Sequence, residues 1–140
     1  MVYAEIVSGL WIGNVDMMYN KKFLQDNQIT LIINCTHNFK FSNLPNIQNV
    51  RIPLSDILIN NIDQLRIHKD KILTFIDTSL ESHNILLCCY DGISNSPFIV
   101  SLYLIKYGGI SKDKIKRIIQ SKGKDISMDY DLDLLDLLDL

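Results

Sequence analysis

Two strongly apolar segments dominate the pattern of hydrophobic and polar positions along the chain. Residues 30–35 and 85–88 are largely apolar runs, which is typical of strands buried on both faces of a sheet. Residues 62–80 carry apolar side chains at spacings of three and four, which predicts a long helix. Residues 97–107 are apolar on nearly all sides, which predicts a central helix. The pattern also predicts shorter elements: strands at 4–7, 10–12 and 49–54, and helices at 16–25, at 112–120 and from Asp129 to the end.

The order of these elements predicts an α/β fold with a central, largely parallel sheet flanked by helices on both faces. A chain of 140 residues is long enough to bury a core and fits a single domain spanning residues 1–140. No apolar run reaches the roughly 18 residues that cross a membrane, and the first residues lack the pattern of a secretory signal. We therefore expect an intracellular protein that does not bind membranes, in the cytoplasm, with the nucleus as the alternative.

Charge is distributed unevenly along the chain, although the net charge is only -2. Six of the 16 acidic residues lie within 125–140, and that segment has no basic residue. Such a segment most often forms the exposed face of a terminal helix. The predicted helix at 112–120 has a basic outer face, which we interpret as solvated. The composition therefore indicates no nucleic-acid partner, and it leaves the oligomeric state open.

The three cysteines do not form a disulfide framework, because their number is odd and two of them are adjacent. Cys35 ends a predicted buried strand, whereas Cys88 and Cys89 end another. No spacing of cysteines or histidines matches a metal site. We expect three free thiols, and neither a metal nor another cofactor.

Residues 85–97 carry the clearest chemical signal in the chain. An apolar strand ends in Cys89, a short loop containing Gly92 follows, and Pro97 lies in the first turn of the next helix. A junction of this kind gathers backbone N–H groups and the positive end of a helix dipole around one point, which favours an anion. The sequence therefore predicts an anion cradle with the thiol of Cys89 at its mouth.

This stretch resembles the H-C-x5-R-[ST] signature of the protein tyrosine and dual-specificity phosphatases. Residues 9–14 are similar to the family's G-L-[YW]-[IL]-G-N opening, and 29–35 and 52–56 are similar to its next two segments, so the resemblance covers essentially the whole chain. It implies the protein tyrosine phosphatase-like fold of a minimal dual-specificity phosphatase, with Cys89 as nucleophile and Asp56 as general acid. The phosphate-binding loop that it implies consists of Cys89, Tyr90, Asp91, Gly92, Ile93, Ser94, Asn95 and Ser96.

Three residues of this stretch work against phosphatase chemistry. Cys88 stands where the family has histidine, and Asn95 stands where it has the arginine that grips phosphate. A thiolate at neutral pH needs positive charge or hydrogen bonds around it, and an amide offers only a neutral hydrogen bond to phosphate. Asp91 adds a negative charge to the loop, which repels a dianionic substrate.

Three functions follow from these residues. The favoured one is a catalytically inactive member of the family, a pseudophosphatase that acts by binding a phosphoprotein or another protein partner. The second is a weak cysteine-dependent protein phosphatase that uses Cys89 and Asp56. The third is a thiol switch in which Cys88 and Cys89 form a disulfide, although a bridge between neighbours is strained. In the second function, the lost positive charge would be replaced by one of three arginines, Arg51, Arg66 or Arg117.

Overall fold

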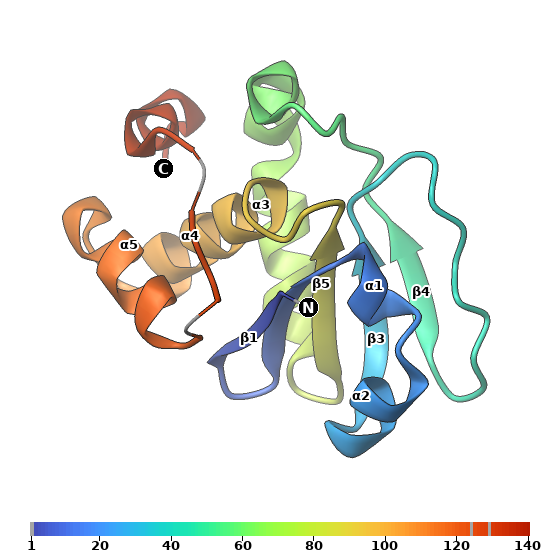
Figure 1. Ribbon diagram of the computed structural model, residues 1–140. Coiled ribbons are helices and arrows are strands. Elements are labelled where there is room, and N and C mark those ends of the chain that lie inside the picture. Colours follow the sequence, from blue (N-terminus) through green and yellow to red (C-terminus); the bar gives the residue numbers. More distant parts are fainter. Residues whose placement is uncertain (1, 124, 129) are drawn as a thin grey trace.

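Five strands form one mixed sheet at the centre of the molecule (Figure 1). The computed structural model describes residues 2–123, 125–128 and 130–140. The strand order is β1-β2-β5-β3-β4; β1 is antiparallel to β2, and all other neighbours are parallel. The strands are β1 (Tyr3–Val7), β2 (Leu10–Asn14), β3 (Ile29–Asn34), β4 (Gln48–Arg51) and β5 (Asn84–Cys89).

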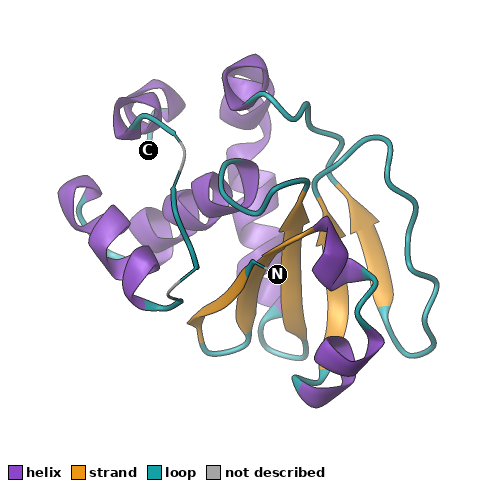
Figure 2. Ribbon diagram, in the orientation of Figure 1, coloured by secondary structure: helices purple, strands orange, loops and turns teal. Residues whose placement is uncertain are grey.

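Helices cover both faces of this sheet (Figure 2). The short helices α1 and α2 pack on one face, and α3, α4 and α5 supply buried side chains to the core on the other face. The central, largely parallel sheet flanked by helices on both faces is therefore confirmed. The helices are α1 (Val15–Met18), α2 (Lys21–Asp26), α3 (Ile62–Ser79), α4 (Asn95–Gly108) and α5 (Lys112–Ser121), with 3₁₀ helices η1 (Leu58–Asn61) and η2 (Leu132–Leu138).

Strand β5 lies in the middle of the sheet, between β2 and β3, as its apolar sequence predicts. Successive side chains of a strand point to opposite faces. Leu87 and Cys89 accordingly belong to the core under α3 and α4, whereas Leu86 and Cys88 belong to the core under α1 and α2. All four side chains are at most 1% exposed, so β5 holds the two layers together.

Two predicted elements differ in detail from the structure. The helix predicted at 16–25 is two short helices, because the side chain of Asn20 accepts a hydrogen bond from the Phe23 backbone N–H and starts α2. Strand β4 ends at Arg51, two residues before Pro53, which has no N–H to donate to a sheet. Helix α3, by contrast, is continuous over 18 residues, as the spacing of its apolar residues predicts.

None of the helices in the described part of the chain combines the length and apolar character that a membrane crossing requires.

The acidic C-terminal segment packs onto the domain through its leucines. The terminal helix is the 3₁₀ helix η2, which begins after Asp131, while the predicted start, Asp129, lies outside the described residues. Leu135 and Leu138 are 3% and 0% exposed in the core that α3 and α4 share. Asp133 and Asp136 of η2 are exposed, and Lys112 of α5 lies 3.2 Å from Asp133 and 2.9 Å from Asp136. The terminal helix η2 therefore packs on the domain through its leucines and exposes its aspartates to solvent.

This packing predicts a large difference between two neighbouring leucines. We expect Leu138→Ala to lower the free energy of unfolding by about 2–5 kcal/mol, because it leaves a cavity in the core. Leu137 is 47% exposed, so Leu137→Ala is the matched control, and we expect it to change stability by less than about 0.5 kcal/mol. Urea denaturation of the two variants measures the difference, and equal losses would show that η2 is not docked as described.

Candidate active site

Cys89 lies at the end of β5, and its sulfur is the centre of the loop that follows. The side chain is 1% exposed. Its Sγ accepts hydrogen bonds from the backbone N–H groups of Gly92, at 3.2 Å, and Ser96, at 3.4 Å, and it lies 3.0 Å from Ser96 Oγ. The loop therefore does direct backbone N–H groups toward this thiol, as the sequence predicts.

Gly92 allows the loop to turn tightly against the neighbouring strand. Its φ is +76°, a left-handed conformation that favours glycine, and a Cβ there would lie 2.9 Å from the backbone nitrogen of Asn14. The backbone N–H of Val15 also donates to the carbonyl oxygen of Tyr90 at 3.3 Å. The end of β2 thus fixes the position of the loop.

The side chain of Asp91 folds back into the loop. Its Oδ1 accepts hydrogen bonds from the Ile93 backbone N–H at 3.0 Å and from Ser94 Oγ at 3.2 Å. The same oxygen lies 3.7 Å from Cys89 Sγ, whose thiol donates to it. A loop N–H that would serve a bound anion is therefore taken by a carboxylate of the protein itself.

These surroundings keep Cys89 protonated. Burial is the largest influence and raises the pKa of the Cys89 thiol above its ordinary value of 9.0, and the charge of Asp91 raises it further. Hydrogen bonds from Ser96 and Gly92 lower this pKa and only partly oppose the increase. At neutral pH the sulfur is a thiol, which is a poor nucleophile.

Asn95, at the position of the signature arginine, is buried in an amide network. The side chain is 2% exposed; its Nδ2 donates to the Ser55 carbonyl oxygen at 2.8 Å, and its Oδ1 accepts from Asn61 Nδ2 at 3.0 Å. Asn61 also donates to the Ser55 carbonyl oxygen at 2.8 Å and accepts from the Ser55 backbone N–H at 2.9 Å. We call these three residues the Ser55–Asn61–Asn95 clasp. It ties the start of α4 to the segment before α3.

Asp56, the predicted general acid, directly follows Ser55 and is exposed. Within the described residues, its carboxylate makes no hydrogen bond or ion pair, so its role stays a prediction.

Sequence reasoning did not identify Asn61. It lies 34 residues from Asn95 and in no recognisable motif.

Cys88 and Cys89 point to opposite faces of the sheet. Cys88 Sγ donates to the carbonyl oxygen of Asn14 at 3.4 Å and lies in the core under α1 and α2. Burial, together with the nearby Cys89 and Asp16, raises the pKa of the Cys88 thiol well above its ordinary range. Because a disulfide requires the two Cβ atoms to face each other, this arrangement disfavours a bridge between the neighbours. All three cysteines are free and buried.

The arginines considered as replacements for the missing charge are engaged elsewhere or exposed. Arg51 donates to the carbonyl oxygens of Thr36 and Phe39, each at 2.7 Å. Arg66 pairs with Asp63 at 2.9 Å within α3, and Arg117 is exposed on α5. Arg51 in particular holds the connection between β3 and β4 in place.

Comparison with known proteins identifies a family and several relatives. The family model described as "Dual specificity phosphatase, catalytic domain" matches residues 10–133. Mouse dual specificity protein phosphatase 8 is 28% identical over 129 residues, which are 91% of this chain but 19% of that protein. Dual specificity protein phosphatase 1B of Arabidopsis thaliana is 28% identical over 120 residues, which are 85% of this chain and 70% of that protein. The chain thus spans about a fifth of the mouse relative.

Solved structures agree with the fold. A mouse putative dual specificity phosphatase complexed with zinc tungstate superposes with a TM-score of 0.81 at 21% identity, covering 98% of this chain and 84% of that one. The human tyrosine phosphatase-like serine/threonine/tyrosine-interacting protein superposes with a TM-score of 0.79 at 21% identity, covering 98% and 93%. At these identities the likeness establishes the fold.

The environment of Cys89 predicts how its thiol titrates. The difference in ultraviolet thiolate absorbance between the wild type and Cys89→Ser isolates this one group, and we expect its midpoint above pH 9.0. Asp91→Asn keeps an oxygen that accepts the loop hydrogen bonds but removes the negative charge, so we expect a lower midpoint. A wild-type midpoint below neutrality, or a midpoint raised by Asp91→Asn, would contradict this description of the site.

Proposed function

Because the chain belongs to the dual specificity phosphatase family, we propose that it is a pseudophosphatase: a domain with the phosphatase fold that does not hydrolyse phosphoesters and acts by binding a protein partner. The partner is a phosphoprotein or another protein. Three unpaired thiols support a reducing compartment, and we propose the cytoplasm, with the nucleus as the alternative.

The observation that carries this proposal is the carboxylate of Asp91 inside the loop. Its Oδ1 takes the Ile93 N–H and lies 3.7 Å from the sulfur that would attack phosphorus. A phosphate entering the loop would meet this fixed negative charge and would find one of its donors already occupied. Like charges at such distances disfavour each other strongly in a partly buried site.

The second requirement for catalysis, a positive clamp on the phosphate oxygens, is also unmet. The amide of Asn95 is neutral, and both of its ends are used within the clasp. Loss of one preorganised donor or of a catalytic arginine typically lowers a rate by about 10² to 10⁵, which corresponds to roughly 3–7 kcal/mol. Together with a protonated Cys89, this loss supports an inactive site.

The alternative function is a weak cysteine-dependent phosphatase that uses Cys89 and Asp56. One observation favours it: the N–H groups of Gly92 and Ser96 still point to the sulfur and would stabilise a thiolate. These N–H groups and the Ser96 hydroxyl act against burial and the Asp91 carboxylate, which together raise the pKa of the Cys89 thiol, so we rank this function second.

A solved relative is consistent with a binding role. The human protein of similar fold is named tyrosine phosphatase-like serine/threonine/tyrosine-interacting protein, which describes an interacting protein that is like a phosphatase. We extend that description to this chain as part of the proposal.

The proposal predicts no cysteine-dependent turnover. We expect hydrolysis of para-nitrophenyl phosphate, phosphotyrosine peptide and phosphothreonine peptide at the rate of the buffer, and no change in Cys89→Ser, because there is little catalysis to lose. Turnover that disappears in both Cys89→Ser and Asp56→Asn would instead establish the weak phosphatase.

A rescue experiment tests the physical reason for inactivity. Asn95→Arg with Asp91→Ala supplies the clamp and removes the carboxylate, so we expect phosphate binding in the double variant before substantial turnover. Adding Cys88→His restores the signature residue that precedes the nucleophile in the chain, and we expect the triple variant to exceed the wild type by at least about 10²-fold, or roughly 3 kcal/mol of transition-state stabilisation.

The matched control for this rescue is the same triple variant with Cys89→Ser, which must be inactive. Because Asn95 and Cys88 are buried, circular dichroism and urea denaturation establish that each variant is folded. A folded triple variant without turnover would show that the site is silent for a reason other than its charges.

A further inference from the structure

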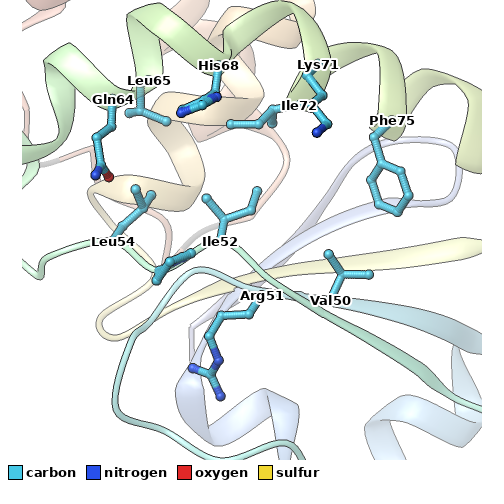
Figure 3. Close-up of a pocket in the computed structure, with 11 residues that line it drawn as sticks. Val50, Arg51, Ile52, Leu54, Gln64, Leu65, His68, Lys71, Ile72 and Phe75 are labelled. Atoms are coloured by element: carbon cyan, nitrogen blue, oxygen red, sulfur yellow. The ribbon is translucent and has the colours of Figure 1, made fainter.

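A groove separates α3 from the edge of the sheet, on the side of the molecule where β4 is the last strand (Figure 3). Its volume is about 440 Å³, within the range of roughly 300–1,000 Å³ that is usual for ligand sites. The floor is made by Val50, Ile52 and Leu54, and the wall by His68, Lys71 and Phe75 of α3.

Strand β4, which supplies Val50 to the floor, has an open edge. Among the described residues β4 pairs with β3 alone, and the backbone N–H of Ile52, the residue that follows β4, donates to the Asn34 carbonyl oxygen at 2.9 Å. Because backbone groups of successive residues in a strand face opposite edges, those of Arg51 face away from β3. The guanidinium of Arg51 points away from the groove and holds the connection between β3 and β4 on the other side (Figure 3). An extended chain can therefore approach this edge from the groove.

The wall of the groove carries the positive charge of Lys71 and ends in the apolar side chain of Phe75. His68, Lys71 and Phe75 recur at three and four residues, so they share one face of α3. Lys71 has no ion-pair partner among the described residues, unlike Lys106, which lies 2.9 Å from Asp70. Phe75 is 39% exposed, and none of the described residues that line the groove is acidic.

We propose that this groove binds an extended acidic–apolar peptide segment of the partner protein, which adds to the edge of β4. Backbone hydrogen bonds to the edge hold the segment, its apolar side chains rest on Ile52 and Phe75, and a carboxylate faces Lys71. The proposal rests on the proposed function, because it names the surface by which an inactive domain would act.

The position of the groove connects it to the candidate active site. Its floor ends at Leu54, and the next residue is Ser55 of the Ser55–Asn61–Asn95 clasp. A bound segment would therefore run toward the clasp.

The chain's own acidic segment is an unsuitable occupant, since Leu135 and Leu138 are already buried in the core.

The experiment titrates the isotope-labelled full chain with a synthetic peptide of about ten residues in which leucine and aspartate alternate, followed by NMR. We expect amide shifts at residues 50–52 and 54 and along α3 from His68 to Phe75, and no binding of the same peptide with lysine in place of aspartate. Lys71→Glu should weaken binding about fivefold and Phe75→Ser about tenfold.

Two matched controls lie outside the groove. Lys114 is an exposed lysine of α5 and Ile67 is a 72% exposed apolar residue of α3, so Lys114→Glu and Ile67→Ser should leave the affinity unchanged. Absence of binding, equal loss in the controls, or shifts on another surface would overturn the proposal. Light scattering that shows self-association abolished by Phe75→Ser would also overturn it, because the occupant would then be a second copy of the chain.

The outcome is independent of catalysis. Peptide binding by a chain that proves to have Cys89-dependent turnover would leave the groove in place and refute the pseudophosphatase. An inactive chain that binds no such peptide would refute the groove alone.

Discussion

The turn between β5 and α4 depends on the close approach of Gly92 to the end of β2. This contact sets where the loop lies, so it also determines that the N–H groups of Gly92 and Ser96 meet at the sulfur of Cys89. The central position of β5 also fixes where the loop begins, because both faces of this strand are buried. The scaffold of a phosphate loop is thus maintained by packing and backbone hydrogen bonds, and neither depends on the charged residues that catalysis would require.

The charges of this loop differ from those of the H-C-x5-R-[ST] signature. The carboxylate of Asp91 lies where a bound anion would lie, and the neutral amide of Asn95 stands where the signature has a cation. The sulfur of Cys89 is a buried thiol in place of a thiolate. Each substitution is compatible with a folded loop because it satisfies its own polar groups: Asp91 accepts from Ile93 and Ser94, and Asn95 bonds to Ser55 and Asn61. The polar side chains of the loop are therefore paired within the protein, although the negative charge of Asp91 disfavours a bound anion.

Much of this arrangement could be predicted from local patterns. The apolar run at 85–88, the glycine and the proline after it indicate a buried strand, a turn and a helix start, and they place Cys89 at the junction. The direction of the Asp91 side chain was not predictable, because it depends on which loop N–H lies within reach. Asn61 was not predictable either, since its contact with Asn95 joins residues 34 positions apart. The groove arises only when α3 and β4, which are separate in sequence, are packed together.

The Ser55–Asn61–Asn95 clasp has a consequence for how such a protein evolves. A buried hydrogen bond between neutral groups contributes about 0.5–1.5 kcal/mol to folding, so this position now supports the native state. A buried charged side chain there would instead need a partner to offset its desolvation. A single change of Asn95 to arginine would therefore lose the clasp hydrogen bonds before any gain in phosphate binding could offset them. Under the proposed function, the stability that the clasp contributes would keep this position from acquiring the signature arginine one mutation at a time.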